Sequence, residues 1–561
     1  MFKRDRRSVY ELSQHDVGLH GRFGVLGAVA ATLAITAVVI TTVPFGRGAW
    51  DFVFILDGAY RISNGLTPHV DFSSPIGSLS FYVVAFLQRV LPGVHPFVGM
   101  HVAMWFLVMP VIAVLAPRFA DGWRFLAATA LASFIVLLPM TLDSTHLSEI
   151  SYFASYNRFA TAFLFLGGIW LVLPKRKHDW LLLTYILLVL FFLKITAAFV
   201  LCLILVAAVM LGRWSWVQGC LTLVGFGAGL LALQIATGLP LGYLDDVVMM
   251  SAVNQGRAIY AILFTGFRNW VPLAVTGVLA ATALCALHRD RSLTLARPVH
   301  AVQVFLRDER FVVDTVLLVG AAWAAESQNT GGLGLFAALA ALFHPDAWKR
   351  HRLTVGVLMA ALLFPVMDIA VKRSITALSR EKIAAPEQLL AHALSGNTRV
   401  PMSTFEGARL LERISHEWLP LAQEVQTARF FLTPDPTSNA VAAQLAWFHG
   451  VVEAARAFEE NGYRTRATRF TTIAFADPFA RLLQVTPATG TNLVMDRGRT
   501  VPDYSPDQLR SYLENANGVF LERCDMTNDE LETLFLPILQ SEFDELPLTQ
   551  CWSFFARTKG N

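Results

Sequence analysis

Acidic, basic and aromatic residues gather in a short segment that follows the first apolar run of the chain. Between Trp50 and Tyr82 the acidic and basic members of this group are Asp51, Asp57, Arg61, His69 and Asp71. A carboxylate can take a proton from an acceptor hydroxyl, and a cation can neutralise charge growing on a departing phosphate. Ionisable residues at a membrane boundary are costly to place and are usually functional. We therefore expect an active site here, with Asp51 as the general base and Asp57 as a second catalytic carboxylate.

Each of these side chains also has a structural interpretation. Asp51 could be a solvated loop residue or the cap of a helix. Asp57 and Arg61 are four residues apart and could pair across one helical turn. Asp71 lies at a turn, where it could bond nearby backbone. Arg61, His69 and Asp71 are expected to contact substrate if the functional interpretation holds.

A second polar group lies at 143–158 and is expected to contact substrate or acceptor. Its members are Asp143, His146, Glu149, Tyr156, Asn157 and Arg158. The first three are spaced by three residues, so they could line one helical face and could also hold a divalent cation. Their spacing matches no recognised metal signature, so we predict no metal site. The alternatives are a polar helix cap and, for Arg158, a contact with lipid headgroups.

Two further polar positions interrupt apolar runs. Lys194 lies within the run 180–212, where a lone charge is costly. If this run forms two helices, Lys194 lies at their external turn, where it could bind a lipid-linked phosphate or extend to the headgroups. Glu326 and Gln328 lie in another short external turn, where such side chains suit sugar recognition, although a plain helix-to-helix turn is common.

The composition identifies an integral membrane protein. The 561 residues are 55% hydrophobic and 16% charged, with a mean hydropathy of +0.50, whereas soluble domains are about 25% charged. The net charge of +3 gives no reason to expect nucleic acid as a partner. About eleven apolar runs could form spans, at 23–43, 97–116, 125–141, 159–174, 180–193, 195–212, 215–236, 261–287, 311–325, 330–343 and 353–372.

Lys and Arg residues gather in alternate loops, which the positive-inside rule places in the cytoplasm. This topology requires that 78–91 does not cross the membrane and that 180–212 crosses twice. We predict a cytoplasmic segment at 1–22, a transmembrane domain at 23–372 whose first external loop is 46–96, and an external domain at 373–561.

The hydropathy falls after about residue 371, where helical and strand-like patterns alternate. Helices are expected at 386–394, 406–424, 440–460, 506–515 and 529–543, and strands at 429–432, 470–474, 518–522 and 549–557. This alternation predicts a small α/β domain. Its two cysteines, Cys524 and Cys551, could form a bond in an oxidising compartment, and the sequence leaves this open.

The first external loop resembles that of GT-C glycosyltransferases, polytopic enzymes that use polyprenyl-phosphate sugars. These include the protein-mannosyltransferase and lipid A aminoarabinose transferase branches. The resemblance is carried by Trp50-Asp51, Ala59-Tyr60-Arg61-Ile62, Gly65, Pro68-His69, Asp71-Phe72, Pro75, Gly77 and Phe81-Tyr82. It implies that Asp51 is the catalytic or acceptor-orienting carboxylate. The chain departs from the family at Phe52, where many members have a second acidic residue, and at Ser74-Pro75-Ile76-Gly77, where many have Lys or His before a double proline.

The residues and the resemblance predict an α-helical polytopic membrane enzyme with an external α/β domain. It would transfer a hexosyl or pentosyl group, with inversion, from a polyprenyl-phosphate donor to a glycan, lipid or protein acceptor. The resemblance implies a bacterial inner membrane with the C-terminal domain in the periplasm, and we expect no cofactor except possible use of a divalent cation. One alternative is a transporter or flippase of lipid-linked glycans, which should show two related halves with interrupted helices. Another is a non-catalytic membrane scaffold.

Overall fold

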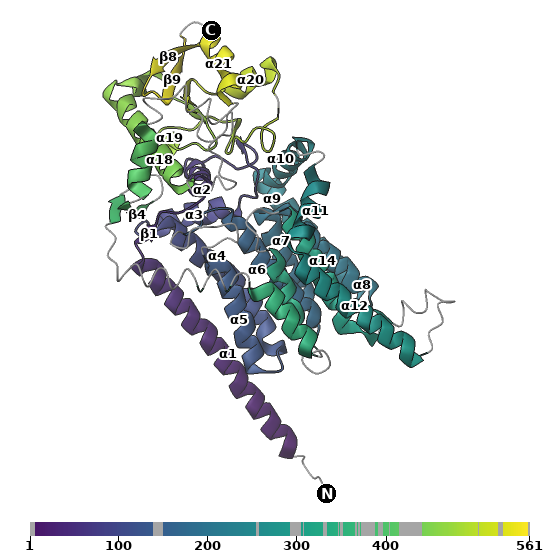
Figure 1. Cartoon of the computed structure of the whole chain (residues 1–561). Coiled ribbons are helices and arrows are strands. Elements are labelled where there is room, and N and C mark those ends of the chain that lie inside the picture. The colour runs from purple at the N-terminus through teal and green to yellow at the C-terminus, as the bar shows by residue number, and fades with distance from the viewer. Residues whose placement is uncertain are drawn as a thin grey trace.

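The computed structural model of the chain is mostly helical, with a smaller lobe of strands and helices at one end (Figure 1). It describes residues 6–138, 150–253, 257–291, 305–306, 308–328, 334–345, 347, 352–364, 367, 371, 387–390, 396–402, 404–413, 440–502, 504–524 and 531–558. We call 440–558, with its gaps, the C-terminal lobe.

Within the described ranges, three helices are long and apolar enough to cross a membrane. They are the Gly18–Val39 part of α1 (Arg6–Val39), Pro96–Arg118, which contains α4 (Pro96–Leu115), and α9 (Trp216–Thr237). The expected span at 261–287 is instead two helices, α11 (Arg257–Arg268) and α12 (Trp270–Arg291), that meet at a bend of 81°. Together they would count as a fourth span.

The other expected spans coincide with shorter helices. These are α5 (Gly122–Leu137), α6 (Ser155–Val172), α7 (Asp179–Leu193), α8 (Ile195–Met210), α14 (Arg310–Ser327), the 3-10 helix η2 (Gly334–Phe343) and Arg352–Phe364. Nearly every side chain of α6 is buried, and the helix packs against α5, α7, α8 and η2. The run 180–212 divides at Lys194, between α7 and α8.

Residues 46–96 contain two helices, which lie beneath the lobe (Figure 1). They are α2 (Ala49–Ser63) and α3 (Leu79–Val90), and α3 is only 12 residues long. Such a length is short for a span. Most of α2 is buried, because it packs against α3 on one side and against the lobe helix α19 (Phe479–Leu482) on another.

The lobe is built around a four-stranded sheet in the order β5-β7-β9-β8. The strands are β5 (Phe470–Ile473), β7 (Gly518–Glu522), β9 (Trp552–Arg557) and β8 (Phe543–Pro547), and β5 and β7 are parallel while the other pairs are antiparallel. Successive residues of a strand face opposite sides. Phe520 and Phe554 accordingly pack against α18 (Ala440–Glu460), whereas Val519 and Phe555 belong to a second core that includes Phe535 of α21 (Leu531–Glu542).

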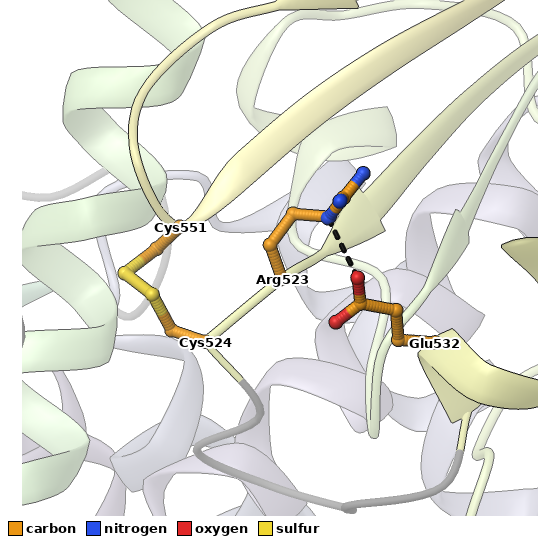
Figure 2. The surroundings of a disulfide bond; sticks show 4 residues. All are labelled: Arg523, Cys524, Glu532 and Cys551. Atoms are coloured by element: carbon orange, nitrogen blue, oxygen red, sulfur yellow. Dashed lines mark ion pairs between the residues drawn. A yellow bond between two sulfur atoms is a disulfide. The ribbon is translucent and has the colours of Figure 1, made fainter. Parts of the chain in front are cut away.

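A disulfide joins Cys524, just after β7, to Cys551, just before β9 (Figure 2). The sequence left this pairing open. Arg523 lies beside the bond and forms an ion pair of 2.8 Å with Glu532 at the start of α21. The cross-link reduces the freedom of the unfolded chain between the two strands, which stabilises the lobe.

The helix expected at 386–394 is wrong. Residues Glu387–Leu390 form β3, which pairs antiparallel with β4 (Asn397–Pro401), and β4 pairs in parallel with β1 (Thr42–Pro44) after the first helix. Pairing with distant strands, which periodicity cannot show, decides the structure here. The sequence analysis did not predict the strand β8, because it follows α21 without a break. The strand expected at 429–432 lies outside the described residues.

A buried arginine joins the lobe to helix α2. The Arg61 guanidinium is fully buried, and its Nε donates to Asp57 Oδ2 (2.8 Å) one turn earlier on α2. Its Nη2 donates to Asp477 Oδ2 of the lobe (3.1 Å), and its Nη1 donates to Thr491 Oγ1 (3.0 Å) and to the Ala488 carbonyl (3.3 Å). Since isolated buried charges are very costly, this network holds the lobe on α2.

Two further features reinforce this junction. The strand β2 (Phe72–Ser73) pairs in parallel with β6 (Thr491–Asn492) of the lobe. The other oxygen of Asp477, Oδ1, accepts hydrogen bonds from the amides of Phe479 (3.0 Å) and Ala480 (3.2 Å), which begin α19. One carboxylate therefore caps a lobe helix and binds Arg61 at the same time.

Replacing Arg61 by Leu should destabilise the docked lobe by about 3–5 kcal/mol, because two carboxylates would stay buried without their shared cation. Thermal unfolding in detergent and protease cleavage within 440–558 measure this loss. The matched control is Arg510→Gln, because the Arg510 side chain is 57% exposed in its ion pairs with Asp507 and Glu542, and such pairs are worth about 0–1 kcal/mol. Equal effects of the two substitutions would contradict the assigned role of Arg61.

Candidate active site

A cavity of about 600 Å³ lies between the helices and the C-terminal lobe. Four charged side chains line it, namely Asp51, Lys194, Asp496 and Arg499. The rest of the wall is mostly aromatic or apolar and includes Phe54, Ile76, Phe153, Tyr156, Tyr243, Val247, Met250, Phe475 and Val494. A few polar groups in a largely apolar hollow are typical of a small-molecule site.

Asp51 lies in the first turn of α2 and points to the start of α6. Its Oδ2 accepts a hydrogen bond from the Ala154 amide (2.8 Å). Burial raises the pKa of Asp51 to about 7, although the Ala154 bond and the charge of Arg499 lower it and Asp496 raises it. A carboxylate with such a pKa exchanges its proton near neutral pH, as a general base must.

The position of Asp51 depends on a close contact between two loops. The amide of Arg47 donates to the Ile150 carbonyl (3.1 Å), and the amide of Tyr152 donates to the Arg47 carbonyl (2.8 Å). Gly48, at φ +74°, has no room for a side chain, because a Cβ there would lie 2.6 Å from Phe153. This contact brings the Ala154 amide to Asp51.

The structure groups several of the predicted residues around Lys194. Its Nζ donates to Asn157 Oδ1 (2.8 Å) and to the Gln328 carbonyl (2.8 Å), and it lies 5.7 Å from the centre of the Tyr156 ring. Lys194, Tyr156 and Gln328 all line the cavity. Glu326 has a different contact, since its Oε2 accepts from the amide of Gly334 (2.6 Å) at the start of η2.

Asp57 and Arg61 do not line the cavity. Asp57 is six residues beyond Asp51, which is about 240° around the axis of α2, and it therefore faces the junction with the lobe. Burial raises the pKa of Asp57 to about 7, against the lowering effect of Arg61. The sequence analysis offered an ion pair between Asp57 and Arg61 as the structural alternative. The structure contains this pair and adds Asp477 as a second partner of Arg61.

Three other predicted residues also lie outside the cavity wall, namely His69, Asp71 and Arg158. Each forms a contact with another part of the protein. His69 Nδ1 lies 2.7 Å from Asp246 Oδ2 of α10 (Leu239–Val253). Asp71 Oδ2 accepts from the Thr67 amide (2.6 Å), as expected of a turn residue. Arg158 Nη2 donates to Ser155 Oγ (2.9 Å) within α6. These contacts shape the loops that carry the cavity wall.

Asp143, His146 and Glu149 lie outside the described residues. In the part of the chain that the structure describes, no three His, Cys, Asp or Glu side chains gather closely enough to hold a metal ion.

The sequence analysis missed the wall contributed by the lobe. Asp496, Arg499 and Thr500 come from one turn more than 400 residues after Asp51. The charged pattern Asp496-Arg497-Gly498-Arg499 is a signal of a polar turn. Nothing in the spacing of this turn relates it to residues 46–96, so its place in the cavity follows only from the fold.

Comparisons with known proteins add a distant likeness. No family model matches the chain, and no curated protein matches it. The chain is similar to the crystal structure of ArnT from Cupriavidus metallidurans in the apo state, with 14% sequence identity and a TM-score of 0.38. The similarity covers 96% of this chain and 98% of that chain. At this level, the family and the activity of the chain must be argued from its own site.

Replacing Gly48 by Ala should move Phe153 and Ala154 away from Asp51 and destabilise the protein by about 2–4 kcal/mol, from overpacking and backbone strain together. The control is Gly65→Ala, since Gly65 also has a positive φ (+86°) but a Cβ there would meet nothing within 4 Å. Strain alone should cost this control about 1 kcal/mol. Thermal unfolding compares the two, and a Gly48 variant no less stable than the Gly65 variant would refute the loop contact.

Proposed function

We propose that this chain is an inverting GT-C-type glycosyltransferase of a bacterial inner membrane. It would move a hexosyl or pentosyl group from a polyprenyl-phosphate donor to a glycan, lipid or protein acceptor on the outer face. The observation that carries the proposal is the cavity itself. It combines a buried carboxylate of raised pKa with two cations, between apolar helices and the lobe.

The residues of the cavity suit a direct displacement. The acceptor hydroxyl oxygen forms a bond to the anomeric carbon of the sugar while its proton passes to the Asp51 carboxylate. The bond between the anomeric carbon and the phosphate oxygen breaks, and its electron pair leaves with the polyprenyl phosphate. Because the oxygen attacks from the side opposite the leaving group, the configuration inverts. Cations in the cavity wall stabilise the charge that develops on the phosphate.

Other features support this assignment. Aromatic rings in the wall, such as Tyr156 and Tyr243, offer flat faces and hydroxyls to a sugar. The disulfide of the lobe is typical of proteins that face an oxidising compartment, which agrees with an external lobe. A cavity between that lobe and apolar helices can receive both a lipid carrier and an outer acceptor.

The alternative of a glycan transporter or flippase draws on one observation, the sharp bend between α11 and α12. Interrupted helices form the substrate sites of many transporters. Neither of these helices contributes a residue to the cavity. The charged groups lie instead beside the lobe, as expected of an enzyme that works at one face.

Transfer should be measured in proteoliposomes with a panel of polyprenyl-phosphate sugars. Asp51→Asn should lower kcat/KM by about 10²–10⁴, the usual contribution of a general base. The base acts when ionised, so wild-type kcat/KM should rise with pH and level off above an apparent pKa of about 7, and the variant should lack this rise.

The control is Asp245→Asn, an exposed carboxylate of α10 that does not line the cavity, and its transfer should stay within about twofold of wild type. Retention of wild-type transfer and the same pH profile in Asp51→Asn would exclude Asp51 as the base.

A further inference from the structure

We propose that Arg499 of the C-terminal lobe, rather than Lys194, is the cation that binds the phosphate group of the lipid carrier. Arg499 is paired with Asp496, and on binding it would exchange this partner for the phosphate. The inference rests on the proposed function for the identity of the carrier. It assigns a substrate-binding role to a part of the chain in which the sequence singled out no site residue.

The geometry of the lobe presents Arg499 to the cavity from a firm turn. The Asp496 carbonyl accepts from the amides of Arg499 (3.0 Å), Thr500 (2.8 Å) and Val501 (3.1 Å). Gly498 adopts φ +72°, which allows the chain to reverse, and its amide donates to the Val501 carbonyl (2.9 Å). Thr500 Oγ1 donates to the Val494 carbonyl (3.0 Å). Backbone hydrogen bonds and the Thr500 hydroxyl therefore hold the turn.

The two cations of the cavity have different surroundings. The Lys194 ammonium has three N–H donors, and it donates hydrogen bonds to Asn157 and Gln328. Asn157 belongs to α6 and Gln328 follows α14, so these bonds join both helices to the break between α7 and α8. Moving this ammonium to a ligand would leave those acceptors without it. Lys194 thus holds the cavity wall together.

The ion pair of Arg499 with Asp496 is open to solvent. Its Nη1 donates to Asp496 Oδ2 (2.9 Å), and the two side chains are 55% and 20% exposed. Ion pairs this exposed contribute little and exchange readily. A guanidinium can offer two parallel N–H groups to a phosphate, which carries more charge than one carboxylate. An incoming phosphate can therefore displace Asp496.

The location of Arg499 also fits the reaction. Asp51 and Arg499 line the same cavity from opposite parts of the molecule, α2 and the lobe. A phosphate bound to Arg499 would leave the attached sugar inside the cavity that Asp51 lines. Since the Arg61 network holds the lobe on α2, docking of the lobe fixes the distance between the base and the phosphate-binding residue.

The test is equilibrium binding to the full-length protein in nanodiscs, with polyprenyl phosphate, the unphosphorylated polyprenol and inorganic phosphate as probes. Arg499→Gln should weaken polyprenyl phosphate binding about 10- to 100-fold, the loss expected for a charged hydrogen-bonding partner, and should leave polyprenol binding unchanged. Arg499→Lys should weaken it less. Inorganic phosphate should compete in wild type if the phosphate group alone is recognised, and it should not compete if the lipid chain is also needed.

Two further variants make the outcome specific. Asp496→Asn should tighten polyprenyl phosphate binding, because it removes the competing negative charge, while the backbone hydrogen bonds of the turn do not involve the substituted side chain. Arg497→Gln removes a positive charge from the same turn but outside the cavity wall, and binding should stay within about twofold of wild type. Unchanged binding in Arg499→Gln, equal loss in Arg497→Gln, or weaker binding in Asp496→Asn would each overturn the assignment.

These results separate the inference from the proposed function. Binding that depends on Arg499, without sugar transfer from any donor, would support the phosphate site and reject the transferase. Sugar transfer by wild type, with normal polyprenyl phosphate binding by Arg499→Gln, would support the transferase and reject this role of Arg499.

Discussion

The burial of one guanidinium sets the arrangement of the whole site. Arg61 is enclosed by Asp57 of its own helix and by Asp477 and Thr491 of the lobe. A fully buried cation is tolerated only with such partners, so the lobe must dock in one position. Asp51 lies in the first turn of the same helix, α2. The docked position of the lobe on α2 therefore also fixes the position of Asp51 relative to the lobe.

This arrangement explains why two carboxylates of one helix have different roles. Asp51 faces a cavity and bonds a single backbone amide, so its environment favours neither protonation state strongly near neutral pH. Asp57 faces the junction and bonds a guanidinium. The angular separation along the helix, rather than the residue type, decides which carboxylate meets a ligand.

Local features of the chain could be predicted from the sequence because they depend on short-range patterns. The division of 180–212 near Lys194 followed from the alternation of basic loops along the chain, and α18 coincides with the helix expected at 440–460. Asp51, Tyr156, Lys194 and Gln328 were selected separately, and the structure places all four around one cavity.

Features that depend on distant contacts could not be predicted. The strand β3 exists through its pairing with β4, although its residues have a helical pattern. No sequence pattern indicates that Asp477 pairs with Arg61. Likewise, no pattern indicates that Arg499 lines the same cavity as Asp51. Both relations arise when the lobe docks, which joins residues more than 400 positions apart.

The most direct test of the central claim is photo-crosslinking with a polyprenyl-phosphate sugar that carries a photoreactive group on the sugar. Labelled peptides, identified by mass spectrometry, should come from both walls of the cavity, from the start of α2 and from the lobe turn at 494–500. Labelling confined to other regions, or labelling of only one wall, would contradict a donor site shared between the helices and the lobe.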